Sequence, residues 1–180
     1  MLKGLFDFSG ALILVLVLSP FLVLVMLFIW LAERKSALFV QDRVGVNKRI
    51  FRIYKFRTMH DGEITPIGKV LRRTGIDELP QLLNILIGQM SFVGPRPLTV
   101  ADLERLGWND DFHSMRWEVR PGIVGLAQLT PVCHKKMSWF YDVVYIKKRT
   151  IWLDIKIVLI AGIIPLVGKQ KVKNWIHGVR

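Results

Sequence analysis

Two adjacent carboxylates, Asp77 and Glu78, stand in the stretch RRTGIDELPQLLNIL (residues 72–86) of a 180-residue chain with a formal net charge of +12. An acidic residue in the first turn of a helix meets unpaired backbone N–H groups, which stabilises the helix by about 0.3 to 1 kcal/mol. The pair could instead form a salt bridge to Arg72 or Arg73. A third interpretation is catalytic, because a carboxylate that is kept ionised by arginines and a helix start can serve as a nucleophile or Mg²⁺ ligand, with its neighbour as base. The dipeptide alone does not decide among them.

Three arginines have local sequences that suit phosphate binding. Arg72 lies five residues before Asp77, Arg96 lies in GPRP, and Arg120 lies in RPG. The prolines restrict the backbone around Arg96, which lowers the entropy lost when its guanidinium is placed against a phosphate. Three such groups could hold a diphosphate. Each arginine taken singly is more typical of an ordinary turn with a solvated or salt-bridged side chain.

Other catalytic layouts are absent from the sequence. The four histidines are isolated and form no HExxH motif or paired metal spacing. Neither a P-loop nor GxGxxG occurs, so the phosphate-binding loops of those nucleotide folds are missing. The single cysteine, Cys133, has no partner for an intrachain disulfide, which fits a reducing compartment.

Residues 11–32 form an uncharged apolar run that would extend about 33 Å as one straight helix, enough to cross a hydrocarbon core of about 30 Å. Ser19-Pro20 interrupts this run, because a proline inside a helix removes one hydrogen bond and clashes with the preceding turn. The residues therefore leave two topologies open, a kinked span and a helix that turns at Ser19-Pro20 and leaves on the same membrane face. Arg34 and Lys35 directly after the run favour a cytoplasmic globular part.

The rest of the chain contains the positive charge. Residues 1–32 contribute only Lys3 against Asp7, so the excess lies in residues 33–180. Such a field favours anionic lipids, phosphorylated substrates or nucleic acid. Hydrophobic residues make up 52% of the chain, which is high for a soluble protein and indicates membrane contact.

The elements that would position these residues are mainly helices with a few short strands. We expect two strands within 37–59, a loop over 60–66, a short basic-edged helix over 67–73 and a helix from Asp77 to Ile87 that stops at Gly88. Further along we expect extended chain at 91–99, helix–turn–helix over 101–119, a strand or loop at 120–129, and helices over 138–149 and 151–167. The last is short and charged enough to be a buried or membrane-surface helix.

Several extended motifs occur in order and together resemble the bacterial sugar transferase family, the small monotopic polyprenol-phosphate phosphoglycosyl transferases. These motifs are YKFRTM (54–59), TPIGKVLRRTGIDELPQLLNIL (65–86), MSFVGPRPL (90–98), RPGIVGLAQL (120–129) and LDIKI (153–157). The resemblance covers essentially the whole chain. It implies transfer of a sugar 1-phosphate from a UDP-sugar to a polyprenyl (undecaprenyl) phosphate with release of UMP, the first membrane step of bacterial glycoconjugate synthesis.

The resemblance also implies roles for individual residues. Asp77 matches the family's nucleophile, which forms a covalent aspartyl-phosphosugar and binds Mg²⁺, and Glu78 matches the assisting base or metal neighbour. Arg72, Arg96 and Arg120 fall on basic motif positions that we assign to phosphate or nucleotide contacts.

For the membrane, the resemblance favours re-entry with the break at Ser19-Pro20. The implied fold is α+β, mainly helical, with amphipathic interfacial helices. Residues 1–35 would form a membrane-embedded helix–break–helix, and residues 36–180 a catalytic domain on the cytoplasmic face of the bacterial inner membrane, with a membrane-contacting C-terminal helix.

Three departures from the family pattern bear on the donor sugar. The sequence names neither the sugar nor the pathway nor the oligomeric state, and a homodimer is left open. Gly75 stands where the family often has serine, Gln89 where it often has aspartate, and LTPVCHKK (129–136) replaces a VNGRN-like stretch. The last affects the expected sugar most, because that region could shape the donor site.

Two alternative functions use the same features. A membrane-bound phosphatase or pyrophosphatase would use the same carboxylates with water as acceptor. A non-enzymatic basic module tethered to the membrane would bind nucleic acid or anionic lipid through charge, with an affinity that falls steeply in salt. Rigid Arg-Pro motifs and paired carboxylates are not needed for such adhesion, so we expect an enzyme whose partners are a UDP-sugar, a polyprenyl phosphate and anionic phospholipid, with no nucleic acid.

Overall fold

The computed structural model describes residues 2–130 and 134–168. Its elements fall into two compact units, Met1–Gln41 with Arg52–Gly88, and Asp42–Phe51 with Gln89–Arg180. The strands β1 (Leu38–Val44) and β2 (Ile50–Phe56) pair with each other, and each contributes residues to both units. The two strands expected within 37–59 are confirmed.

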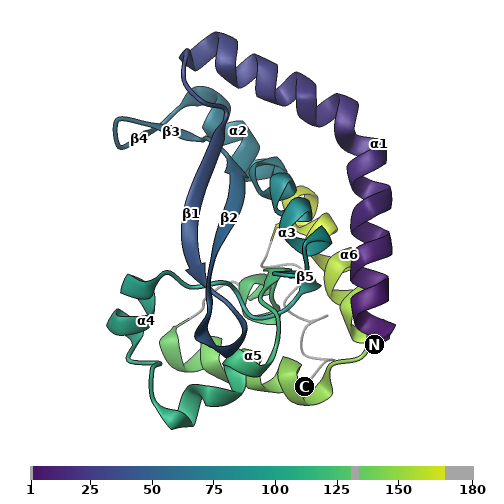
Figure 1. The fold of residues 1–180 in the computed structure, drawn as a ribbon, viewed down its shortest axis with the longest axis vertical. Helices are drawn as coiled ribbons and strands as arrows, with labels where there is room; N and C mark the ends of the chain where they lie inside the picture. The colour runs from purple at the N-terminus through teal and green to yellow at the C-terminus, as the bar shows by residue number, and fades with distance from the viewer. Residues whose placement is uncertain (1, 131–133, 169–180) are drawn as a thin grey trace. The chain divides into compact units, whose positions relative to one another are not determined.

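The first unit begins with α1 (Leu2–Glu33), one helix that continues through Ser19 and Pro20. Figure 1 shows that it bends partway along its length. The Ser19 hydroxyl donates a hydrogen bond of 2.9 Å to the Leu16 carbonyl, which is the back-bond that promotes bending beside a proline. Within the described residues, α1 is the one helix long and apolar enough to cross a membrane, by length and composition.

The core of the first unit joins α1 to the elements that follow it. Ile29 is buried against Ala37, Phe56 and Leu71. The last of these lies on α2 (Pro66–Thr74), which begins where the Thr65 side chain accepts a hydrogen bond from the Gly68 N–H, with Pro66 at the first helical position. The short helix expected over 67–73 is confirmed.

The segment after α2 differs from the sequence prediction. In place of one helix from Asp77 to Ile87, the chain forms a 3₁₀ helix, η2 (Ile76–Gln81), and a short α-helix, α3 (Leu82–Leu86). Pro80 lies inside η2 and cannot donate to a carbonyl one α-helical turn earlier, and the Glu78 N–H bonds instead to the Gly75 carbonyl at 3.1 Å. Gly88, at φ +77°, ends the segment as expected.

The predicted loop over 60–66 contains a small antiparallel pair, because β3 (Met59–His60) pairs with β4 (Glu63–Ile64). Asp61 and Gly62 form its turn, both with positive φ.

The second unit contains a two-stranded parallel pair and most of the remaining helices. Strand β5 (Ser91–Val93) pairs with β6 (Gly122–Val124), with Ser91 opposite Gly122 and Val93 opposite Val124. The remaining elements are η1 (Val46–Lys48), α4 (Val100–Leu106), η3 (Asp111–Glu118), η4 (Leu126–Leu129), α5 (Lys135–Lys148) and α6 (Ile151–Val167). Here η again denotes a 3₁₀ helix, and the expected helix–turn–helix is α4, a turn at Gly107 and η3.

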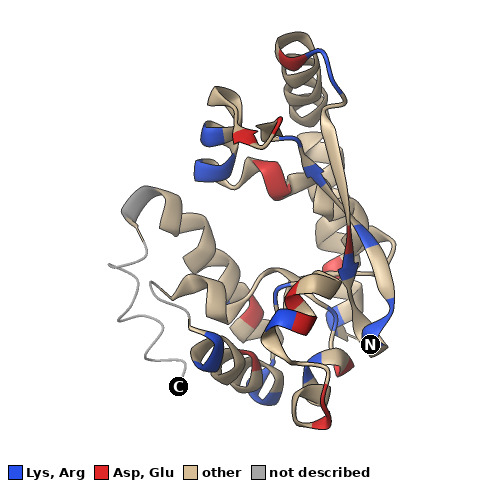
Figure 2. Cartoon of the chain, turned by 90° about the vertical axis from the view of Figure 1, so that its left-hand side faces the viewer, with Lys and Arg blue, Asp and Glu red and all other residues tan. Residues whose placement is uncertain are grey.

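The architecture is mainly helical with a few short strands, as the sequence predicts. Lys and Arg residues are spread over elements outside the apolar part of α1 (Figure 2). The assignment of residues 1–35 to a membrane and of 36–180 to its cytoplasmic face stays a prediction. Cys133 and the basic tail after Gly168 lie outside the described residues.

Candidate functional site

Asp77 and Glu78 lie in the first turn of η2, immediately after the end of α2. Gly75 joins the two helices at φ +75°, the left-handed region that glycine enters without strain. A serine, which the family often has here, would be strained at this φ. Both carboxylates are half-buried. A 3₁₀ helix of six residues provides a shorter dipole than the α-helix expected from sequence, so neighbouring side chains matter more to the two charges.

Lys55 is the cation closest to this acidic pair. Its Nζ lies 2.5 Å from Glu78 Oε1, and both side chains are largely shielded from solvent. The salt bridge of Glu78 is thus formed with a residue of β2, and not with Arg72 or Arg73 as one sequence alternative held. Sequence reasoning quoted Lys55 inside YKFRTM but gave it no role.

The electrostatics of Asp77 differ from those of its neighbour. Burial raises the pKa of the Asp77 carboxyl, and the adjacent Glu78 charge raises it further, while Lys55 and Arg72 act in the opposite direction. Among the described residues, no side chain donates a hydrogen bond to this carboxylate. Asp77 is therefore a half-buried carboxylate whose oxygens are not engaged by other side chains.

The position of the Arg72 side chain is set by a close contact between α2 and Thr58. Its Nε donates a 2.8 Å hydrogen bond to the hydroxyl of buried Thr58. Gly68 permits this approach, since a Cβ there would lie 2.1 Å from the Thr58 carbonyl oxygen. Arg72 as a whole is exposed, and its charge acts on Asp77. The first unit thus brings Arg72, Asp77 and Glu78 together.

The acidic pair suits a hard cation. The described residues contain no group of three or more His, Cys, Asp or Glu side chains that could hold a metal by themselves. Mg²⁺ is usually held by one or two carboxylates, with substrate phosphates and water completing its shell. Two half-buried carboxylates, one of which has a burial-raised pKa, fit that ligand set.

The other two predicted arginines lie together in the second unit. Arg96 and Arg120 are both exposed, and each is flanked by buried residues, among them Pro95 and Pro121. The Gly122 N–H donates to the Pro95 carbonyl at 3.0 Å. Gly94 and Gly122 allow the two segments to touch, since a Cβ on Gly94 would lie 2.3 Å from the Arg120 carbonyl oxygen. The glycines and prolines of GPRP and RPG therefore hold both arginine backbones side by side.

A buried arginine that the sequence analysis missed supports this arrangement. Arg116 is 4% exposed, donates hydrogen bonds to the Asp142 carboxylate and to the backbone carbonyl of Arg96, and lies over the rings of Trp108 and Trp117 at 5.2 and 5.5 Å. The signal in the sequence was an arginine between apolar residues in SMRWEV, which local patterns cannot distinguish from a solvated one.

Comparison with known proteins decides the family. The family model for bacterial sugar transferases matches residues 1–164. The chain belongs to the bacterial sugar transferase family. Asp77, Glu78 and the three predicted arginines of this family member all lie inside the matched region.

The names of the curated relatives specify different sugars. The chain is 38% identical over 186 residues to the undecaprenyl-phosphate glucose phosphotransferase of Komagataeibacter xylinus. The aligned region covers 88% of this chain and 34% of that relative. The chain is 36% identical over 178 residues to a UDP-glucose:undecaprenyl-phosphate glucose-1-phosphate transferase of Caulobacter vibrioides, covering 87% and 67%.

A third relative, the UDP-N-acetylgalactosamine-undecaprenyl-phosphate N-acetylgalactosaminephosphotransferase of Aeromonas hydrophila, is 36% identical over 171 residues, covering 84% and 40%. The sugar transferase chain thus spans well under half of the length of the Komagataeibacter and Aeromonas relatives.

Proposed function

We propose that the protein transfers a sugar 1-phosphate from a UDP-sugar to undecaprenyl phosphate and releases UMP. A carboxylate oxygen of Asp77 attacks the phosphorus that carries the sugar, the bond from this phosphorus to the bridging oxygen of the diphosphate breaks, and UMP leaves with that oxygen and its electron pair. A phosphate oxygen of the polyprenyl phosphate then attacks the aspartyl-phosphosugar. This second displacement forms a polyprenyl diphosphate sugar and returns the Asp77 carboxylate.

The observation that carries this proposal is the setting of Asp77 in a member of this family. Its oxygens are not engaged by side chains of the described residues, its desolvation makes an ionised oxygen more reactive than in water, and Arg72 lies near enough to act on its charge. Lys55 Nζ lies 2.5 Å from Glu78 Oε1 and fixes Glu78 beside Asp77, where we assign it to assist as base or metal neighbour.

We also propose that Asp77, with Glu78 beside it, holds Mg²⁺ together with the donor phosphates. When bound, the ion neutralises charge on the transferring phosphoryl group. The residues themselves place the nucleophile, and Arg72 offers its exposed N–H groups to phosphate oxygens. Removal of divalent ions with a chelator should stop turnover, and added Mg²⁺ should restore it.

Arg96 and Arg120 are proposed to contact the donor phosphates or nucleotide. We expect Arg96→Ala to raise KM for the UDP-sugar between about 10-fold and 100-fold, because a lost charged hydrogen bond costs about 1.5 to 3 kcal/mol. Arg105→Ala is the matched control, since Arg105 is an exposed arginine whose partner is Asp102 at 2.9 Å, and exposed pairs contribute little. Equal donor KM values for Arg96→Ala and the wild type would remove Arg96 from the site.

For the membrane we propose a re-entrant α1 with both ends on the cytoplasmic face of the bacterial inner membrane. The bend of α1, the Ser19 back-bond and Pro20 support this topology, as do Arg34 and Lys35 directly after the helix. With Cys133 replaced by serine, single cysteines placed at residue 2 or after residue 180 should each react with a membrane-impermeant thiol reagent only in inverted vesicles. Labelling of the N-terminal tag in intact cells would establish a span instead.

The deciding experiment is a screen of nucleotide sugars with undecaprenyl phosphate and Mg²⁺, in which the lipid product and the released nucleotide are identified. The proposal requires UMP and a lipid diphosphate sugar in equal amounts. UMP release over many turnovers without the lipid would indicate a phosphatase or pyrophosphatase. Salt-sensitive binding to anionic vesicles with no turnover on any donor would indicate a tethered binding module.

A further inference from the structure

Asn84 is the polar residue in the apolar run of α3, LLNIL. Its side chain is 0% exposed. Burial of a carboxamide is unfavourable unless its donor and acceptor groups find hydrogen-bond partners. The partners of Asn84 therefore indicate what the residue does in the fold.

The carboxamide bonds to the backbone of β2 through both of its polar atoms. The Tyr54 N–H donates to Asn84 Oδ1 at 3.2 Å, and Asn84 Nδ2 donates to the Arg52 carbonyl at 2.7 Å. In the described part of the chain the sheet of β2 has two strands, so β1 pairs with one edge of β2 and leaves the other to side chains. Asn84 thus takes the place of a backbone residue in a third strand. We call these two hydrogen bonds the Asn84 clasp.

The segment that carries Asn84 also carries the acid pair. The 3₁₀ helix η2 continues directly into α3, so Glu78 and Asn84 lie on one helical segment. Glu78 meets Lys55, which follows Tyr54 on β2, at 2.5 Å. The helical segment and β2 are therefore joined twice, by the clasp and by the ion pair, at neighbouring positions of the strand.

The clasp is the more rigid of these two joints. Asn84 is short, fully buried and bonded at both polar atoms. Lys55 reaches Glu78 with a flexible four-carbon stem, and the two side chains are 17% and 24% exposed. An ion pair that water can reach constrains geometry only weakly. The placement of Lys55 on Glu78 therefore depends on the clasp more than the clasp depends on the ion pair.

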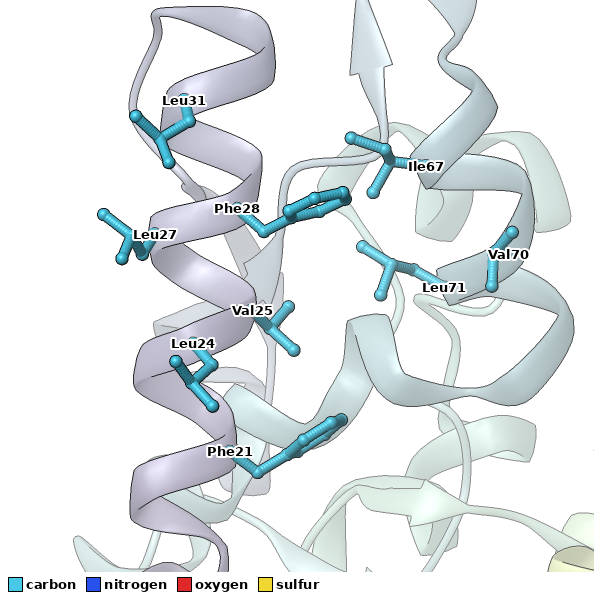
Figure 3. Close-up of a pocket in the computed structure, with 9 residues that line it drawn as sticks. All are labelled: Phe21, Leu24, Val25, Leu27, Phe28, Leu31, Ile67, Val70 and Leu71. Carbon is cyan, nitrogen blue, oxygen red and sulfur yellow. The ribbon is translucent and has the colours of Figure 1, made fainter.

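The contacts of the preceding helix do not extend to the acid pair. Arg72 bonds to Thr58 before Gly75, whose φ of +75° separates α2 from η2. Toward α1, helix α2 borders a pocket of about 540 Å³, and Figure 3 shows Phe28 of α1 and Leu71 of α2 among its lining side chains. All of the lining residues are aliphatic or aromatic, and incompletely packed apolar contact has no preferred direction. A directional constraint on η2 has to come from its other end, where Asn84 lies.

We propose that Asn84 is a positioning residue for the transfer reaction, whose clasp fixes η2 and α3 on β2 and thereby holds Lys55 against Glu78. This inference rests on the proposed function. Asn84 bonds to backbone and not to reacting groups, so loss of the clasp should slow the chemical step and leave donor binding by the three predicted arginines nearly unchanged. A displacement of about 1 Å near reacting groups can lower a rate about a hundredfold.

Two adjacent buried residues of α3 provide a matched pair of variants. Asn84→Ala removes the clasp and leaves a polar space in which water can bond to the β2 backbone. Ile85→Ala truncates a side chain that is 2% exposed and keeps the clasp.

We expect Asn84→Ala to slow formation of the aspartyl-phosphosugar about 10-fold to 100-fold, with KM for the UDP-sugar within about twofold of the wild type. Ile85→Ala should melt at a lower temperature because of its cavity, yet keep a rate within about twofold of the wild type. Asn84→Ser, whose hydroxyl is one bond too short to reach the β2 backbone, takes the place of Asn84→Ala if the alanine variant does not fold.

A second background separates positioning from stability. Lys55→Met lacks the ion pair, so Asn84→Ala should lower the remaining rate by less than about twofold in that background, whereas independent effects would multiply. Single-turnover measurement of the protein adduct by mass spectrometry follows these slow rates. Equal losses from Asn84→Ala with and without Lys55 would show that Asn84 acts on the fold alone and would overturn the proposal.

Chemical modification of Lys55 gives a readout that does not depend on turnover. In the wild type, acetic anhydride should acetylate Lys55 more slowly than exposed Lys69, because Lys55 Nζ is bonded to Glu78. Asn84→Ala should raise the Lys55 rate several-fold relative to Lys69, and Ile85→Ala should leave the ratio unchanged. An unchanged ratio in Asn84→Ala would overturn the proposal while UMP release by the wild type continued. A wild type that releases no UMP from any donor would instead refute the proposed function.

Discussion

Asp77→Asn should abolish sugar-phosphate transfer, lowering turnover by at least about a thousandfold, because a carboxamide cannot form the acyl phosphate. Incubation of the wild type with a UDP-sugar and no acceptor should add the mass of one sugar phosphate to the protein. The Asp77→Asn variant should carry no such adduct. Wild-type turnover in the purified variant would refute the assignment of Asp77 as nucleophile.

The same substitution should leave the protein at least as stable as the wild type. Burial and Glu78 raise the pKa of Asp77, so the ionised carboxylate is less favourable in the folded protein than in the unfolded chain. Any stability from this group is present below the unfolded pKa of 3.8 and is lost as pH rises through the raised folded value. At pH 7 a neutral isostere removes that penalty, and the melting temperature of Asp77→Asn in detergent should equal or exceed that of the wild type.

Glu78→Gln provides the contrast at the neighbouring position. Glu78 is bonded to Lys55, so its neutralisation leaves a largely shielded lysine without its carboxylate. We expect this variant to retain the covalent adduct, to lose turnover less than Asp77→Asn does, and to melt below the wild type. We expect Asp77→Asn to be inactive but stable, and Glu78→Gln to be less active and less stable than the wild type. This contrast would distinguish a carboxylate that reacts from one that also stabilises the fold through a salt bridge.

Local sequence patterns predicted the helices whose formation depends on residues close together in the chain. The uncharged apolar run indicated α1, and the basic-edged segment 67–73 indicated α2, because amphipathic spacing acts within a few residues; the Thr65 cap and Pro66 at the helix start, which the sequence analysis placed in a loop, complete α2. The α-helix predicted over 77–87 is wrong for its first half, which is the 3₁₀ helix Ile76–Gln81, because Pro80 has no N–H to donate to a carbonyl one α-helical turn earlier; residues 82–86 are α-helical as predicted.

Pairings between distant residues could not be predicted in this way. Lys55 meets Glu78 across 23 positions, and Arg116 meets Asp142 across 26. Neither pair has a periodic or capping signature, so a lysine in a strand or an arginine between apolar residues carries no local sign of its partner. Asp77 and Arg72 were singled out from their local sequence and given roles by the family resemblance, whereas the contacts of Lys55 and Arg116 required the fold.

Loss of the Arg116 charge should cause the largest stability change in the second unit. Arg116 and Asp142 are both buried, and we expect Arg116→Met to lower the free energy of unfolding at pH 7.5 by about 3 to 5 kcal/mol, because the Asp142 carboxylate remains buried without its cation. Replacement of both residues, as in Arg116→Met with Asp142→Leu, should recover most of that loss. Denaturant titrations in detergent would measure both effects.

The pH dependence of Arg116→Met has a definite sign. In the wild type, burial raises the pKa of Asp142 to about 6 although Arg116 lowers it. Without Arg116 the pKa rises further, so the carboxyl takes up its proton at a higher pH. Stability from this group is present below the unfolded value of 3.8 and is lost as pH rises through the folded value. The deficit of the variant should therefore shrink as pH falls from 7.5 toward 5, and the double variant should lack this trend.

The double variant also tests whether Arg116 positions Arg96. Arg116 donates to the Arg96 carbonyl, and this bond is lost in both the single and the double variant, whereas the buried charge is uncompensated only in the single one. If the bond sets the direction of the Arg96 guanidinium, KM for the UDP-sugar should stay raised in the double variant after its stability has recovered, with kcat changed less. A donor KM that returns to the wild-type value together with stability would assign Arg116 to packing alone.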